Sequence, residues 1–452
     1  MISGTVILTW LLVTPLVGAA LSLVGGAVIA RLPEAHREEA ASAPHHFAVG
    51  VGLFCLVLEV LLLVGPPVSA DFRWTPDLAQ LRLHVDRMVA IFLPVITLGA
   101  LVGMVAQMRR EARTAWEHAA RQAPVLLGLS AALTAAVAAD FVLVVFALGT
   151  TGLAAWLAAS GGDPEQVGEQ VLGRHGLGLG LTLVGVALAY VVTRDEYLPT
   201  AGEGMLVASS GTGVVIALFL GLGLGALLGG IPGCSWHERG VRLPEAACYL
   251  APFAAACLLA VRLPVLLVPK FMLAEVRPLL WLPIAGTWMG MVAAWQPGRG
   301  ESARWLWTGL GALALGAALA AGLGPKAAAA DRVVEVASLA TLAVGAVALA
   351  GLSRQAFFPV GVAVLGLAGV TLVGLPLALG AVAGIGGLLG MLLALAPAAL
   401  ALGFAGLWRS RAEQPGGSSL PAGLVTLACL ALVVALQLAP GWLAAGMPRG
   451  LP

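Results

Sequence analysis

The chain has 452 residues, of which 60% are hydrophobic and only 10% are charged. Soluble globular proteins have about 45–50% apolar and about 25% charged residues, so this composition excludes a soluble protein. The formal net charge of +1 provides no basic field, which excludes a nucleic-acid-binding protein. Because about 20 apolar residues cross a bilayer, we expect about a dozen spans in one membrane domain over residues 1–452.

Apolar runs between charged residues predict an all-α integral membrane protein with about fourteen transmembrane helices. Two apolar stretches, divided at Asp140 and near Gly374-Leu375-Pro376, are too long for one crossing of a core of about 30 Å. We therefore expect each of these stretches to fold back on itself. The predicted spans are 5–30, 47–65, 88–107, 124–139, 141–160, 176–193, 205–232, 246–268, 278–295, 304–324, 333–352, 356–380, 381–407 and 420–446.

The charges in the loops predict the orientation of the chain. With the N-terminus outside, the cytoplasmic loops carry 14 basic residues and the opposite loops carry 9. Positive charge favours the cytoplasmic side of a membrane. We therefore expect a multi-pass protein of the cell (inner) membrane with its N-terminus outside.

The sequence carries no motif of a soluble active site. It has no Gly-rich phosphate loop, no zinc-spaced histidine pair on one helix and no nucleophile triad, so we expect no metal, no cofactor and no catalytic residue. The pair His45-His46 falls in the first predicted loop and is interpreted as solvated. The cysteines lie mostly in apolar runs and are interpreted as small buried hydrophobic residues; they are Cys55, Cys234, Cys248, Cys257 and Cys429.

Charged residues inside predicted spans are the candidate ion-path groups, because a charge in the membrane is costly. Arg262 lies deepest, after about 16 apolar or small residues, and Pro264 follows it. A proline there removes a backbone donor and leaves carbonyls that the arginine can satisfy. The alternative is an arginine whose side chain extends to the end of its span.

Two acidic residues are further candidates. Glu59 lies one or two turns inside the second span, where a carboxyl is either a proton carrier or a structural contact between helices. Asp140 divides the fourth and fifth spans, which favours a helix cap over a group deep in the membrane.

Charged residues near the ends of other spans complete the candidate set. Lys270 and Glu275 lie in the Pro-rich link 264–283, which is either an ordinary polar loop or a funnel into the bundle. Asp331 and Glu335 begin the eleventh predicted span, where acids are favourably placed near a helix N-terminus.

The order of motifs resembles the antiporter-like, proton-conducting subunits of respiratory complex I and of Mrp-type cation/proton antiporters. That family also includes the membrane partner of a proposed bicarbonate-uptake complex. The resemblance covers residues 72 to 380. It is carried by a Trp-Pro hairpin that leads to an Asp in 72–88, by Asp140-Phe141-Val142-Leu143, by Gly173-Arg174-His175-Gly176, by Val261-Arg262-Leu263-Pro264 with Ala285-Gly286, and by Gln355-Ala356-Phe357-Phe358 with Gly374-Leu375-Pro376.

The resemblance implies two inverted five-helix repeats with broken helices, which we place at 124–268 and 278–407. It also implies a row of ionisable groups at mid-membrane, with protons or monovalent cations as the transported species. The partners that it implies are other subunits of a membrane complex. The chain departs from the family where ionisable residues are expected. Gly149 replaces a Glu, Arg262 and Gly290 replace two Lys, and Gln355 and Pro359 replace a His and a Lys.

Three functions remain open. Two are described next, and the third is an unrelated polytopic transporter. The first is a subunit of a proton- or cation-translocating complex, in which Arg262 fixes local charge and Glu59 or the 270–277 cluster carries protons. As an enzyme it would be at most a translocase subunit, similar to the NADH-quinone oxidoreductase membrane subunits. The second is a scaffold that kept the fold, lost transport and binds a partner protein.

Overall fold

The computed structural model describes residues 3–73, 80–108, 114–160, 164–194, 197–198, 210–230, 248–267 and 281–295, with positions 308, 309, 312, 315 and 395. Among these residues, five helices are long and apolar enough to cross a membrane, which confirms a helical multi-pass membrane protein. The chain divides into two compact units. The first comprises 1–176 and 240–255, and the second comprises 177–239 and 256–452.

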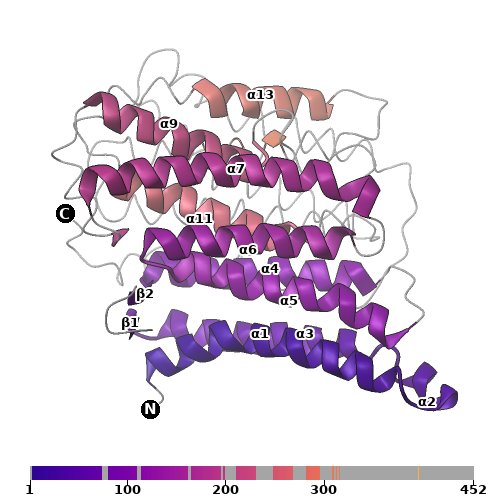
Figure 1. Ribbon diagram of the computed structural model, residues 1–452. Coiled ribbons are helices and arrows are strands. Elements are labelled where there is room, and N and C mark those ends of the chain that lie inside the picture. Colours follow the sequence, from indigo (N-terminus) through magenta and orange to yellow (C-terminus); the bar gives the residue numbers. More distant parts are fainter. Residues whose placement is uncertain are drawn as a thin grey trace. The chain divides into compact units, whose positions relative to one another are not determined.

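The first unit is a bundle of long helices (Figure 1). Helices of 20 to 26 residues are about 30 to 39 Å long, enough to cross a hydrocarbon core of about 30 Å. The short helix α2 (Glu34–Glu39) follows the first of them. The long helices are α1 (Gly4–Ile29), α3 (Ala43–Val64), α4 (Arg87–Met108), α5 (Ala115–Val137), α6 (Phe141–Ser160) and the first part of α7 (Pro164–Thr193).

Helix α5 lies inside this bundle and contacts α1, α3, α4 and α6. It is the most enclosed of the five span-length helices that the structure describes. Small residues allow its close approach to α1, since a Cβ built on Gly26 would lie 2.6 Å from the Cβ of Ala119 and 3.1 Å from the carbonyl oxygen of Ala115. Small residues are what membrane helices use to pack closely.

A two-stranded hairpin connects α3 to α4 at the end of the bundle opposite α2 (Figure 1). Strands β1 (Val68–Arg73) and β2 (Gln80–Val85) pair in antiparallel register, with Val68 opposite Val85. Asp86 then caps α4, because its Oδ1 accepts a hydrogen bond of 2.7 Å from the N–H of Val89. The predicted hairpin and its following Asp are therefore both present.

The second unit contains the rest of α7 together with α9 (Ser210–Leu227), most of α11 (Leu250–Leu267) and α13 (Trp281–Trp295). Helices α7 and α9 pack closely at two glycines of α7. A Cβ built on Gly178 would lie 3.0 Å from the carbonyl oxygen of Gly223, and one built on Gly185 would lie 2.9 Å from Leu220 Cγ. Gly221 has open space around the same position, so not every glycine here serves packing.

The predicted spans match the described helices within a few residues, with two exceptions. Helix α5 begins at Ala115 instead of 124, and α7 begins at Pro164 instead of 176. Helix α5 starts early because Thr114 caps it: its Oγ1 accepts from the N–H of Glu117 at 3.2 Å. The spans from 304 onward lie almost wholly outside the described residues, so the total of about fourteen and the repeats 124–268 and 278–407 stay predictions.

Candidate functional site

Glu59 is a carboxyl enclosed between two membrane helices. It lies on α3, five residues before Val64, the last residue of that helix, and its exposed fraction is 0%. Thr97, also fully buried at the middle of α4, donates its hydroxyl hydrogen to Oε1 of Glu59 at 2.5 Å. The carboxyl is therefore held in place by the neighbouring helix.

The second carboxyl oxygen of Glu59 differs from the first. Oε2 is buried and has no hydrogen-bond partner among the residues that the structure describes. A buried polar atom without a partner costs free energy, and a carboxyl oxygen is able to bind a proton. One oxygen thus fixes the position of the carboxyl, and the other can carry a proton.

Asp140 lies at the fold-back between α5 and α6. Its Oδ2 accepts a hydrogen bond of 2.8 Å from the backbone N–H of Arg82 on β2, and the N–H of Ala139 donates to the carbonyl oxygen of Arg82 at 2.9 Å. Asp140 is 4% exposed and immediately precedes Phe141, the first residue of α6. Its side chain fastens the turn between the two helices to the hairpin.

Arg262 lies on α11 in the second unit and is 4% exposed. The helix continues through Pro264 as far as Leu267, so the proline does not end it. The low exposure places the arginine within protein instead of at a solvated helix end. Of the other candidates, Lys270, Glu275, Asp331 and Glu335 lie outside the described residues.

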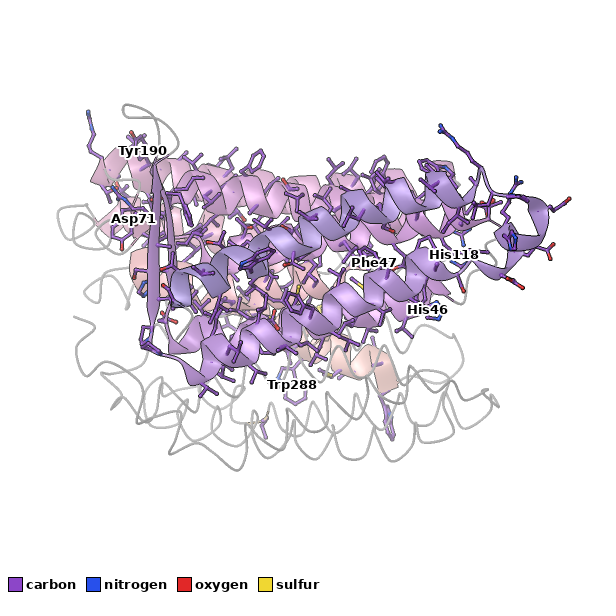
Figure 2. All side chains as sticks on the ribbon, turned by 90° about the horizontal axis from the view of Figure 1, so that it is seen from below. His46, Phe47, Asp71, His118, Tyr190 and Trp288 are labelled. Atoms are coloured by element: carbon purple, nitrogen blue, oxygen red, sulfur yellow. The ribbon has the colours of Figure 1, made fainter. Side chains whose placement is uncertain are left out.

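A polar cluster at the α2 end of the first unit was missed in the sequence. Gln122 on α5 donates from Nε2 to His45 Nδ1 at 2.9 Å and to the carbonyl oxygen of Met104 at 3.2 Å. His45 is 2% exposed, so its predicted solvation is wrong, whereas His46 is exposed. Helix α3 begins at Ala43 and carries both histidines in its first turn. Figure 2 shows His46 and His118 at this end and Asp71 at the other.

Two further polar side chains that connect helices were not predicted as site residues. Gln107 on α4 donates from Nε2 to the carbonyl oxygen of Ala158 at 3.1 Å and to Sγ of Cys248 at 3.0 Å. Cys55, Cys248 and Cys257 are buried, as predicted for them. His175 on α7 has its Nε2 3.2 Å from the carbonyl oxygen of Leu148 on α6. Gln107 is the last residue of a predicted span, and His175 was visible in the sequence only within the motif Gly173-Arg174-His175-Gly176.

The fold of the chain matches solved structures of membrane complexes at low sequence identity. A chain of respiratory complex I from Thermus thermophilus with bound NADH superposes with a TM-score of 0.72 at 16% identity, covering 97% of each chain. The Mrp complex from Dietzia sp. DQ12-45-1b gives a TM-score of 0.71 at 18% identity, over 98% of this chain and 52% of that one. The chain has the fold of antiporter-like membrane subunits.

The same antiporter-like fold occurs in a chain of the membrane-bound sulfane sulfur reductase, an archaeal respiratory membrane complex, with a TM-score of 0.61 at 15% identity, covering 98% of this chain and 97% of that one. No protein-family model and no curated protein sequence matches the chain. Two of the positions at which the sequence predicts a departure from the resembled family hold glycine in described helices: Gly149 in α6 and Gly290 in α13. The shared fold therefore comes with glycine at both of these positions.

Proposed function

We propose that the chain is a membrane subunit of a proton- or monovalent-cation-translocating complex, in which Glu59 carries protons and Arg262 fixes local charge. The observation that carries the proposal is the Glu59 carboxyl, which is fully buried and, among the described residues, bonded through one oxygen only, to Thr97. An ionisable group inside a membrane span is a candidate functional site because its burial is costly. The second site proposed for protons is the 270–277 cluster with Lys270 and Glu275.

The solved structures with this fold support the complex as the setting of the function. They are a respiratory complex I, an Mrp complex and an archaeal respiratory complex, so we propose that this chain also binds other subunits. The loop charges support a place in the cell (inner) membrane with the N-terminus outside. Under this orientation the hairpin lies on the outer side and α2 on the cytoplasmic side.

A scaffold without transport is the second candidate. Gly149 and Gly290 favour it, because a glycine cannot bind or release a proton and the resembled family has ionisable residues at both positions. A scaffold would keep the membrane fold and bind a partner subunit through its surface. This candidate predicts a stable partner in a pull-down and no ion flux.

Reconstitution decides between the two candidates. The chain is purified with its co-purifying subunits and placed in liposomes, and proton or sodium flux is driven by an imposed membrane potential. The translocating subunit predicts flux that falls in Arg262→Ala while the subunits still co-purify. The exposed Arg31 supplies the matched control variant Arg31→Ala. Liposomes that show no flux above the leak of protein-free vesicles, together with intact assembly, would support the scaffold instead.

A further inference from the structure

His175 lies opposite the middle of α6. Its Nε2 is 3.2 Å from the carbonyl oxygen of Leu148, and its ring lies against Gly152. These two residues flank the midpoint of α6, a helix of 20 residues. At about 1.5 Å per residue such a helix is about 30 Å long, which equals the thickness of the hydrocarbon core. The imidazole therefore lies opposite the middle of a helix that is long enough to cross the membrane.

The sequence of α6 leaves room for this ring. Gly152 is buried, and a Cβ built on it would overlap Cδ2 and Nε2 of His175. Gly176, the next residue of α7, has no neighbouring atom within 4 Å of the same position. The imidazole thus occupies a notch that exists because residue 152 has no side chain, which is a close and specific contact between α6 and α7.

The hydrogen bond assigns the two ring nitrogens. A carbonyl oxygen only accepts hydrogen bonds, so Nε2 carries the hydrogen that it donates to Leu148. In the neutral ring Nδ1 is then without a hydrogen and can accept one. Imidazole can therefore take up a proton from water at Nδ1 and return it to water from the same nitrogen, so that one N–H bond forms and then breaks, while Nε2 keeps the hydrogen that it donates to Leu148.

We propose that His175 is a proton-carrying group at mid-membrane, held in the notch at Gly152 between α6 and α7. The inference rests on the proposed function and adds a titratable site to Glu59 and the 270–277 cluster. It accounts for the cost of keeping an ionisable ring at this depth, because such residues occur in membrane spans where ions or protons pass. The ring belongs to the first unit, as do Leu148 and Gly152.

Three variants separate proton transfer from packing. His175→Gln keeps a side chain that can donate to Leu148 but cannot carry a proton. The double variant G152A/H175A removes the ring and refills part of its notch with a methyl group. Gly176→Ala adds the same methyl group to α7 where there is open space, and it is the control. Each is purified with its co-purifying subunits, and proton flux into liposomes is measured together with the thermal unfolding midpoint in detergent.

We expect flux in His175→Gln and in G152A/H175A to fall to the leak of protein-free liposomes, while Gly176→Ala transports as the wild type does. Wild-type flux in G152A/H175A, or in His175→Gln, would overturn the role of His175 and leave the proposed function standing. If His175→Gln lowers the unfolding midpoint, the flux in G152A/H175A decides whether His175 carries protons. Absence of flux in the wild-type protein would instead overturn the proposed function and this role together.

Discussion

Thr97 on α4 donates a hydrogen bond of 2.5 Å to Glu59 on α3, and both side chains are fully buried. The bond joins two neighbouring helices of the first unit and positions a carboxyl inside the membrane. Because the other carboxyl oxygen has no hydrogen-bond partner among the described residues, the pair combines a structural contact with a site for a proton. The two interpretations of Glu59 in the sequence, structural contact and proton carrier, are compatible in one geometry.

Replacing Thr97 by Val should weaken the contact between α3 and α4. Valine has nearly the same shape but no hydroxyl, so the buried Glu59 loses its hydrogen-bond donor. We expect the free energy of unfolding in mixed micelles to fall by about 1 kcal/mol. Thr97→Ser keeps the hydroxyl and should retain most of the wild-type free energy of unfolding. Equal losses in the two variants would show that the methyl group of Thr97, instead of its hydroxyl, stabilises the contact.

Two adjacent glycines of α1 should respond in opposite directions to alanine. A methyl group on Gly26 would lie 2.6 Å from the Cβ of Ala119, so Gly26→Ala overpacks the contact with α5 and should cost about 1–3 kcal/mol of unfolding free energy. Gly25 has nothing within 4 Å of the same position. Gly25→Ala should therefore stabilise the helix by about 0.5–1 kcal/mol. The test is the difference between the two unfolding free energies; a loss in Gly25→Ala as large as that in Gly26→Ala would contradict it.

Asp140 should be needed to hold the hairpin against the turn between α5 and α6. In Asp140→Ala the N–H of Arg82 loses its acceptor at 2.8 Å, and we expect its amide to exchange with deuterium faster. Asp140→Asn keeps an acceptor oxygen and serves as the control. Hydrogen exchange of the peptide over 80–85, followed by mass spectrometry, measures the effect. Unchanged exchange in the Ala variant would mean that the strand pairing alone protects this amide.

The bond between His45 and Gln122 should couple α3 to α5. Gln122→Leu removes the donor of His45 Nδ1 and of the Met104 carbonyl oxygen, and it should cost about 1–3 kcal/mol of unfolding free energy. A double-mutant cycle with His45→Phe isolates the pair. We expect an interaction energy of at least about 0.5 kcal/mol. Additive losses would show that the two residues stabilise the bundle independently.

The sequence predicted the first nine spans well because apolar runs bounded by charges are what the membrane selects. Helix ends were predicted less well where the chain continues into polar residues. The start of α5 shows why: Thr114 and Glu117 form a capping pair ahead of the apolar run, and a search for apolar residues passes over it. A search for Ser or Thr followed three residues later by Glu would have located this start.

The candidate site could be predicted only in part. Glu59 was identified because a charge inside an apolar run is visible in the sequence, but its partner Thr97 is an ordinary residue of another helix. His175 was visible only as part of a motif, because the notch at Gly152 depends on how α6 and α7 approach each other. Contacts between helices are distant in sequence, so residue type and spacing do not indicate them.

The most direct test of the account is proton flux in the reconstituted complex with Glu59→Gln. Glutamine keeps the size of the side chain and an oxygen that accepts from Thr97, so the fold should persist while the proton-carrying carboxyl is lost. The exposed Glu38 supplies the matched control Glu38→Gln. We predict flux at the leak of protein-free liposomes in Glu59→Gln and wild-type flux in Glu38→Gln. Wild-type flux in Glu59→Gln would contradict the proposed role of this carboxyl.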